Sequence, residues 1–125
     1  MQFIINAYDG TDDKALERRM AARPEHLENM KRVQEIAKVL CAGGLLNEEG
    51  KMIGSFLVMD FATQELFDKY LETEPYIKQG VWEKVQVERC NAVIVNNIKV
   101  AYYDDNLSTA GMNYFSTNLR RQTDV

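Results

Sequence analysis

The sequence predicts an α+β fold in which two helices pack on one face of an antiparallel sheet. Segments rich in β-forming residues occur at residues 3–8, 54–61 and 82–89. Between them, apolar residues recur at spacings of three and four over residues 27–40 and 66–71, which indicates amphipathic helices. With a further strand before residue 54, the order is βαββαβ, the ferredoxin-like arrangement.

The first strand, FIINAY at residues 3–8, is closed by the turn signal Asp9-Gly10. We expect a short helix next, which Pro24 interrupts. A second and longer helix then begins at Pro24, since proline is tolerated in a first turn. Its buried stripe consists of Leu27, Met30, Val33, Ile36, Ala37 and Leu40. We expect this helix to end at the pair Gly43-Gly44.

After that pair, Leu45-Leu46 leads into a turn at residues 47–50. The segment GSFLVMDF, residues 54–61, is apolar on both alternating faces, which is typical of a central strand.

A second helix follows, with Thr63 as its predicted cap. Pro75 stops this helix, and the residue before a proline is excluded from helical geometry, so Glu74 is predicted to be extended. Residues 82–89 alternate between valine and charged or polar side chains, which favours an outer strand.

The C-terminal part follows a different pattern. Two apolar segments, residues 92–95 and 98–103, flank Asn96-Asn97, and this predicts an additional β-hairpin. We therefore divide the chain into a core domain at residues 1–90 and a hairpin and tail extension of the same domain at residues 91–125.

Composition excludes several classes of function. A chain of 125 residues with 46% hydrophobic and 27% charged residues suits one globular domain. Its net charge of −4 argues against nucleic acid as a partner. No apolar segment is long enough to cross a membrane, and no secretory leader is visible, so we expect a cytoplasmic protein without a membrane partner. Cys41 and Cys90 lack the spacing of a metal site, and we expect free buried thiols, no metal and no cofactor.

The βαββαβ order is also that of RNA-recognition domains, which stack bases on aromatic residues of two central strands. With Phe61 placed as the last aromatic of that motif, Val58 occupies a stacking position and Gly54 replaces the expected basic residue. The sequence therefore does not support RNA binding.

Four stretches in order resemble the YCII-related family: RPEHL, CAGGLL, GSFLVMDF and EPYIKQGVWEKVQV. The resemblance covers about residues 2–90 and implies small dimeric α+β barrel proteins, paired through their sheets. It also implies a site made of a histidine and a nearby carboxylate, with lyase-type chemistry on small ring compounds such as chlorinated hydroxyquinols. Carried over by motif, these residues are His26 and Glu74, the latter standing where the family usually has aspartate.

His26 is the only histidine of the chain, and histidine is the side chain that exchanges protons most readily near neutral pH. In a first helical turn, the positive end of the helix dipole would favour the neutral imidazole. A carboxylate from Glu74 would stabilise the protonated ring and fix its tautomer. A lone histidine at the edge of an apolar stripe is also commonly structural, and that interpretation stays open.

Other residues are candidates for binding a small-molecule substrate. Arg23, with Arg19, could face an anionic group, although solvated surface charge is the simpler interpretation. Ser55 could bond a ligand or simply begin a strand. Gly43 could present a backbone N–H, and Tyr76 could line a pocket or pack at a dimer contact.

Two functions remain in competition. The first is an enzyme in which His26 moves a proton while Glu74 orients it, in an elimination or isomerisation of a cyclic substrate. The alternative is a non-catalytic dimer that binds a small ligand or acts as an accessory protein. In both cases, a sheet covered by helices on one face only predicts a homodimer that buries the other face.

Overall fold

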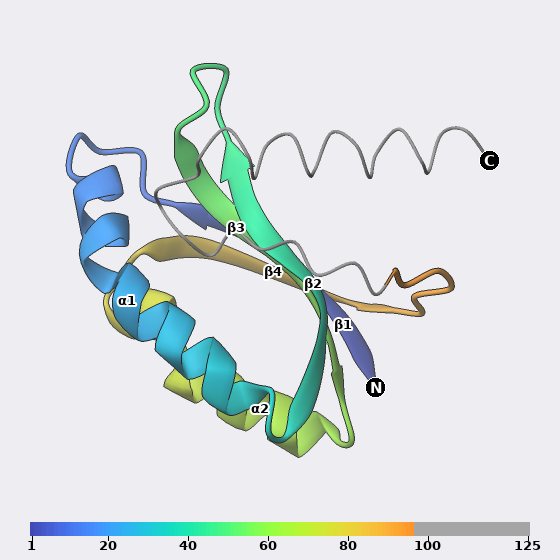
Figure 1. The fold of residues 1–125 in the computed structure, drawn as a ribbon. Helices are drawn as coiled ribbons and strands as arrows, with labels where there is room; N and C mark the ends of the chain where they lie inside the picture. Colours follow the sequence, from blue (N-terminus) through green and yellow to red (C-terminus); the bar gives the residue numbers. More distant parts are fainter. Residues whose placement is uncertain (97–125) are drawn as a thin grey trace. The chain divides into compact units, whose positions relative to one another are not determined.

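The computed structural model covers the whole chain, and the structure describes residues 1–96. Residues 1–93 form one compact unit that contains all the elements. In chain order these are β1 (Gln2–Asp9), α1 (Ala15–Val33), β2 (Ala37–Leu46), β3 (Met52–Phe61), α2 (Gln64–Thr73), α3 (Pro75–Lys78) and β4 (Trp82–Cys90). The helices lie on one side of the sheet (Figure 1). The predicted ferredoxin-like α+β fold is confirmed.

The four strands form one sheet in the order β2-β3-β1-β4, and all neighbours are antiparallel. Ile5 of β1 lies opposite Leu57 of β3 on one side and Val87 of β4 on the other. β3 is therefore central and β4 is an edge strand, as the sequence predicted.

The hydrophobic core lies between the sheet and the helices. Alternate residues of β1 face the helices, and Phe3, Ile5 and Ala7 are each at most 2% exposed. The ring of Phe3 stacks on that of Phe67 in α2, with centroids 3.9 Å apart. Burying a side chain of this size stabilises a fold by about 1.5–3 kcal/mol, so these contacts hold α2 on the sheet.

The opposite face of the sheet carries the alternate residues. In register, Ile4 lies opposite Val58, and Phe56 lies opposite Gly43. These three apolar side chains, Ile4, Phe56 and Val58, are half-buried, and we call them the helix-free face. This is the face that the sequence predicts to be covered by a second copy.

α1 is one continuous helix, so the prediction that Pro24 separates two helices is wrong. Proline inside a helix removes a backbone hydrogen bond and costs about 3 kcal/mol. Buried contacts on both sides of the proline offset this cost, because Arg19 before it and Met30 after it are each less than 9% exposed. His26 consequently lies in the interior of α1. The argument from the helix dipole falls with this correction, since the dipole acts within the end turns.

α1 also ends earlier than predicted, at Val33 instead of near Gly43. Two backbone bonds that span only three residues, from Glu35 to Arg32 and from Ile36 to Val33, tighten the chain after the last turn. The following segment, β2, then pairs with β3 over its whole length. Its apolar residues fit both a helical and a strand period, and the sheet pairing decides between them.

The second helical region agrees better with the sequence. Thr63 is the N-cap of α2, and its hydroxyl accepts a hydrogen bond from the backbone N–H of Leu66 at 3.2 Å. α2 ends at Thr73, and Glu74 is extended before Pro75, with φ −64° and ψ 114°. The sequence did not predict the single-turn helix α3, which begins at Pro75.

Two further predictions concern the C-terminal part and the cysteines. Residues 91–96 form neither helix nor strand, and the rest of the predicted hairpin lies outside the described residues. Both cysteines are free, as expected. They are not buried, however, because Cys41 lies on the edge strand β2 and is exposed, while Cys90 at the end of β4 is half-buried.

Candidate active site

The structure brings His26 and Glu74 together across the helix layer. Nδ1 of His26 lies 2.6 Å from Oε1 of Glu74. The Glu74 side chain is fully buried, and that of His26 is 12% exposed. A side chain from the middle of α1 thus meets one from the junction of α2 and α3, although 48 residues separate them in the sequence. We call these two residues the dyad.

The position of Glu74 follows from its place before Pro75. The proline holds Glu74 in the extended region, which ends α2 and turns the carboxylate back over the next turn. There Oε1 accepts the backbone N–H of Tyr76 at 3.1 Å, so Glu74 also caps α3. The residue that the sequence singled out for its proline is therefore fixed by backbone contacts as well as by His26.

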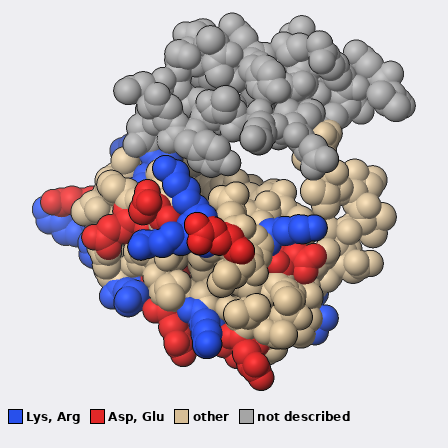
Figure 2. All heavy atoms as spheres, turned by 60° about the horizontal axis from the view of Figure 1, so that its bottom comes forward, with Lys and Arg blue, Asp and Glu red and all other residues tan. Residues whose placement is uncertain are grey.

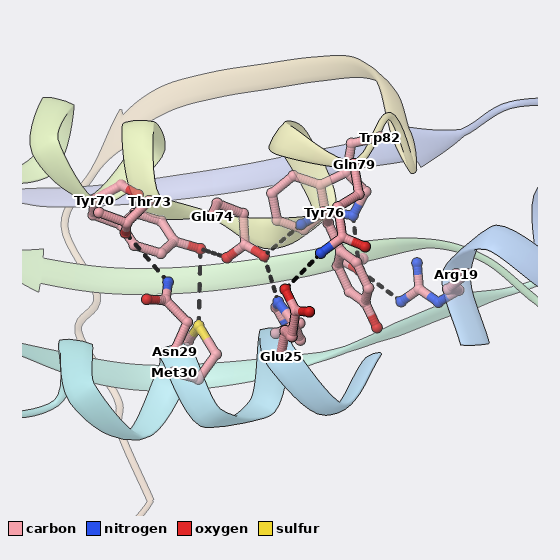
Figure 3. A network of polar contacts seen from close by, with 12 residues as sticks. Arg19, Glu25, Asn29, Met30, Tyr70, Thr73, Glu74, Tyr76, Gln79 and Trp82 are labelled. Carbon is pink, nitrogen blue, oxygen red and sulfur yellow. Dashed lines mark hydrogen bonds and ion pairs between the residues drawn. The ribbon is translucent and has the colours of Figure 1, made fainter. Parts of the chain in front are cut away.

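The second carboxylate oxygen also has a partner. Oε2 of Glu74 accepts the hydroxyl of Tyr70 at 2.7 Å (Figure 3). Burial, together with the adjacent Glu74 charge, holds the pKa of Tyr70 well above its ordinary value, so this phenol keeps its proton and donates. Sequence reasoning missed Tyr70 as a member of the site. Its spacing of four residues from Glu74, one helical turn, was the available signal.

These contacts determine the tautomer of His26. An ionised carboxylate can only accept hydrogen bonds, so Nδ1 carries the proton that lies between the two side chains. The other ring nitrogen, Nε2, then holds a free lone pair. Within residues 1–96 it makes no hydrogen bond, and the single fully buried, unpartnered polar side-chain atom is Nε of Arg19, so Nε2 retains access to solvent.

Aromatic rings enclose the imidazole. Tyr76 stacks on His26 with centroids 4.0 Å apart and planes 12° apart. Trp82 meets the same imidazole edge-on at 6.2 Å. Burial raises the pKa of Tyr76, while the nearby charges of Arg19 and Arg23 act to lower it. Tyr76, a predicted substrate-binding residue, thus forms one wall of the dyad.

A second polar cluster lies on the other side of Tyr76 from Glu74 (Figure 3). Nη1 of Arg19 contacts both carboxylate oxygens of Asp9, at 3.0 and 3.1 Å. Nη2 of Arg19 donates to Oγ of Ser55 at 2.7 Å, and the same oxygen accepts Nε1 of Trp82 at 3.2 Å. Burial raises the pKa of Asp9, and the charge of Arg19 opposes this rise. Ser55 therefore does more than begin a strand.

The remaining two predicted binding residues lie in different places. Arg23 is half-buried on α1, one turn before His26, and its charge reaches the Tyr76 phenol. Gly43 lies on β2 at the helix-free face, away from the dyad. A Cβ atom there would lie 2.7 Å from Cε1 of Phe56, so this glycine gives the Phe56 ring room to pack. The structure thus groups His26, Glu74, Ser55, Tyr76 and Arg23 on one side of the sheet and leaves Gly43 on the other.

A surface cavity of about 420 Å³ lies next to the dyad. Its lining includes Glu25 and Asn29, which flank His26 on α1, and Thr73 and Pro75, which flank Glu74. The two dyad side chains themselves do not line it. The hollow therefore reaches the helices that carry the dyad, but not the imidazole.

Charge at the surface is mixed. Figure 2 shows basic and acidic side chains next to one another on the face in view. Ion pairs along α1, such as Arg18–Asp12 and Lys31–Glu28, account for part of this pattern. Among residues 1–96, no group of three or more His, Cys, Asp or Glu side chains is placed to hold a metal ion. No helix in that same range is both long and apolar enough to cross a membrane.

Comparison with known proteins identifies the family. The family model described as the YCII-related domain matches residues 1–91. Protein YciI from Escherichia coli and from Shigella flexneri is in each case 30% identical over 94 residues, which covers 70% of this chain and 94% of the relative. Among solved structures, 5-chloro-2-hydroxyhydroquinone dehydrochlorinase from Burkholderia phenoliruptrix, in complex with 2,5-dihydroxybenzoquinone, aligns with a TM-score of 0.62. It is 25% identical, and the alignment covers 73% of this chain and 94% of that one. The chain belongs to the YCII-related domain family.

Proposed function

We propose that this protein is a small-molecule enzyme that uses the dyad for lyase-type acid–base chemistry on a small cyclic or aromatic substrate. The observation that carries the proposal is the 2.6 Å contact between Nδ1 of His26 and Oε1 of Glu74, which leaves Nε2 as a proton acceptor. A histidine oriented in this way by a buried carboxylate is the arrangement of a general base.

In the proposed step, Nε2 of His26 takes a proton from a ring hydroxyl or from a ring carbon beside a carbonyl. The electron pair left behind forms a new double bond, and the leaving group departs with the electrons of its own bond. The imidazole becomes positively charged while it lies against the Glu74 carboxylate, which stabilises that charge. The proton then passes to the leaving group or to solvent, and the neutral base is restored.

The structural relative supports the reaction class. That protein is named a dehydrochlorinase, its named substrate is a chlorinated, hydroxylated ring, and its structure holds a dihydroxybenzoquinone. For this chain we propose the same broad class, the elimination of a small group from an oxygenated ring. The planar Tyr76 and Trp82 side chains around His26 suit a flat substrate.

A second candidate function is a non-catalytic protein that binds a small ligand. The low exposure of His26 favours it, as does the cavity, which lies beside the dyad without including it. Such a module needs a pocket but no proton acceptor.

For either function we propose a homodimer. The helix-free face exposes part of Ile4, Phe56 and Val58, and a second copy would remove these side chains from water. Size-exclusion chromatography with light scattering tests this directly. We expect a dimer for the wild type and a shift toward monomer for Val58→Lys, and a monomeric wild type would contradict the proposal.

The proposed activity is tested by a screen of chlorinated and hydroxylated ring compounds, beginning with 5-chloro-2-hydroxyhydroquinone and following chloride release. We expect His26→Gln to lose at least about a hundredfold in kcat, because general-base catalysis contributes about 10²–10⁴. Glu74→Gln should also lose activity, whereas Glu72→Gln, an exposed change on α2, is the matched control and should not. Activity retained in His26→Gln would overturn the mechanism. Binding without turnover in the wild type would favour the ligand-binding alternative.

A further inference from the structure

Two buried hydrogen-bond donors beside the dyad lack acceptors. Within the described part of the chain, Nε of Arg19 is the one fully buried side-chain nitrogen or oxygen atom without a partner. An unsatisfied buried donor costs about 1–3 kcal/mol, so such atoms are rare in folded proteins and call for an explanation. Arg19 is 3% exposed, which leaves bulk water little access to this N–H.

The second free donor is the hydroxyl proton of Ser55. A hydroxyl has one proton and two acceptor lone pairs. Both lone pairs of Ser55 are used, one by Nη2 of Arg19 at 2.7 Å and one by Nε1 of Trp82 at 3.2 Å. No residue from 1 to 96 accepts the hydroxyl proton. Ser55 can therefore act toward a ligand only as a donor.

The surroundings make this donor a strong one. Arg19 is positively charged, and Asp9 holds its guanidinium in place through Nη1. A hydroxyl that accepts from a cation has its O–H polarised, and such networks strengthen one another where water is excluded. Nε and Nη2 belong to the same planar guanidinium, so the free N–H lies within one group's width of the Ser55 oxygen.

This donor pair is close to the dyad. The Tyr76 ring stacks on His26 at 4.0 Å and has the Arg19 guanidinium 4.8 Å from its centroid. Trp82 joins the two places as well, because its N–H bonds Ser55 and its ring meets the His26 imidazole edge-on. Figure 3 shows Tyr76 between Glu74 and Arg19.

We propose that the Ser55 hydroxyl and the Arg19 Nε–H together bind one oxygen atom of the substrate and stabilise the negative charge that develops there when His26 removes a proton. The proposal rests on the function proposed above and narrows its substrate class. The substrate carries an acceptor oxygen, either a carbonyl or a ring oxide, conjugated with the position that loses the proton. In the chemical step, the electron pair released by deprotonation is delocalised onto this oxygen, and it returns to the ring as the leaving group departs. The proton itself stays on Nε2 of His26.

The test uses the full chain with 2,5-dihydroxybenzoquinone as the probe and isothermal titration calorimetry as the readout. We expect Ser55→Ala and Arg19→Lys each to weaken binding by about tenfold or more, since a hydrogen bond to a charged partner is lost. Arg18→Lys is the matched control, because Arg18 is the neighbouring arginine on α1 and pairs with the exposed Asp12. Far-UV circular dichroism establishes that each variant is folded.

A measurement on the wild type keeps the proposal testable if Ser55→Ala does not fold. The absorbance of a hydroxyquinone changes when it ionises, so a titration of the bound and the free probe compares their ionisation. We expect binding to move ionisation of the probe to lower pH, and His26→Gln to bind the probe while losing turnover.

Two results would overturn the inference. One is binding by folded Ser55→Ala and Arg19→Lys within twofold of the wild type. The other is a bound probe that ionises at the same pH as the free one. Either result leaves the proposed function standing if His26→Gln still abolishes turnover. Conversely, loss of binding in Ser55→Ala with no turnover by the wild type would support the oxygen site and reject the enzyme.

Discussion

Glu74 should contribute to stability and to catalysis through different properties of its side chain, and two substitutions separate them. Glu74→Ala removes the acceptor for three donors: Nδ1 of His26, the backbone N–H of Tyr76 and the hydroxyl of Tyr70. Glu74→Gln keeps one acceptor oxygen and nearly the same shape, but removes the charge. We expect the alanine variant to be much less stable and the glutamine variant to be inactive yet folded.

The magnitudes follow from the alternatives open to each donor. Tyr70 can turn its hydroxyl to Sδ of Met30 at 3.8 Å, and His26 can move its proton to the accessible Nε2. The Tyr76 N–H has no such alternative and would stay unsatisfied. Breaking a buried pair of this kind costs about 3–5 kcal/mol, which we expect for Glu74→Ala. For Glu74→Gln we expect about 1 kcal/mol, because the amide oxygen still accepts from both His26 and Tyr76.

The assay is urea unfolding at a fixed protein concentration, followed by fluorescence of Trp82, the single tryptophan, which is 5% exposed and lies beside His26. Glu72→Gln serves as the control and should stay within about 0.5 kcal/mol of the wild type, as exposed substitutions usually do. If Glu74→Ala is also within about 1 kcal/mol of the wild type, with an unchanged denaturant slope, the network around Glu74 does not hold the helices as described.

Three further substitutions test parts of the structure. Tyr70→Phe leaves Oε2 of Glu74 without its donor, and the same urea assay should show a loss of about 1.5–3 kcal/mol; an unchanged midpoint would contradict the contact. Thr63→Ala removes the cap of α2 and should cost about 1 kcal/mol; no loss would mean that the cap does not contribute. Arg18 holds the pKa of Asp12 at about 2, below its ordinary 3.8, so the stabilisation is complete above about pH 4 and disappears as the pH falls through about 2. Asp12→Asn should therefore be less stable than the wild type at neutral pH, and acid unfolding should show this difference vanish in that window; a difference that persists would exclude Asp12 as its source.

The sequence predicted those parts of the fold that depend on local signals. Thr63 and Pro75 bound the second helix through capping chemistry and proline geometry, and both act as expected. The first helix was misjudged because its continuity through Pro24 depends on buried contacts of Arg19 and Met30. Tertiary contacts of this kind override local propensity and leave no periodic signal in the chain.

The same distinction applies to the candidate site. Motif resemblance and the rule for the residue before proline pointed to His26 and Glu74, and the structure places these side chains in contact. Tyr70 and Asp9 were missed because their roles come from pairing across elements, with Glu74 and Arg19 respectively. Gly43 was assigned to the wrong side of the sheet in our reasoning because its segment was taken as the end of a helix, and a strand reverses which residues share a face.

The most direct test of the dyad is the protonation pattern of the single histidine. Nitrogen-15 NMR distinguishes a ring nitrogen that carries a proton from one that does not, and His26 gives one pair of signals without assignment. In the neutral ring, we predict a proton on Nδ1, held by Glu74, and a bare Nε2, with this preference lost in Glu74→Ala. A neutral ring protonated mainly on Nε2 in the wild type would contradict a base aimed at substrate.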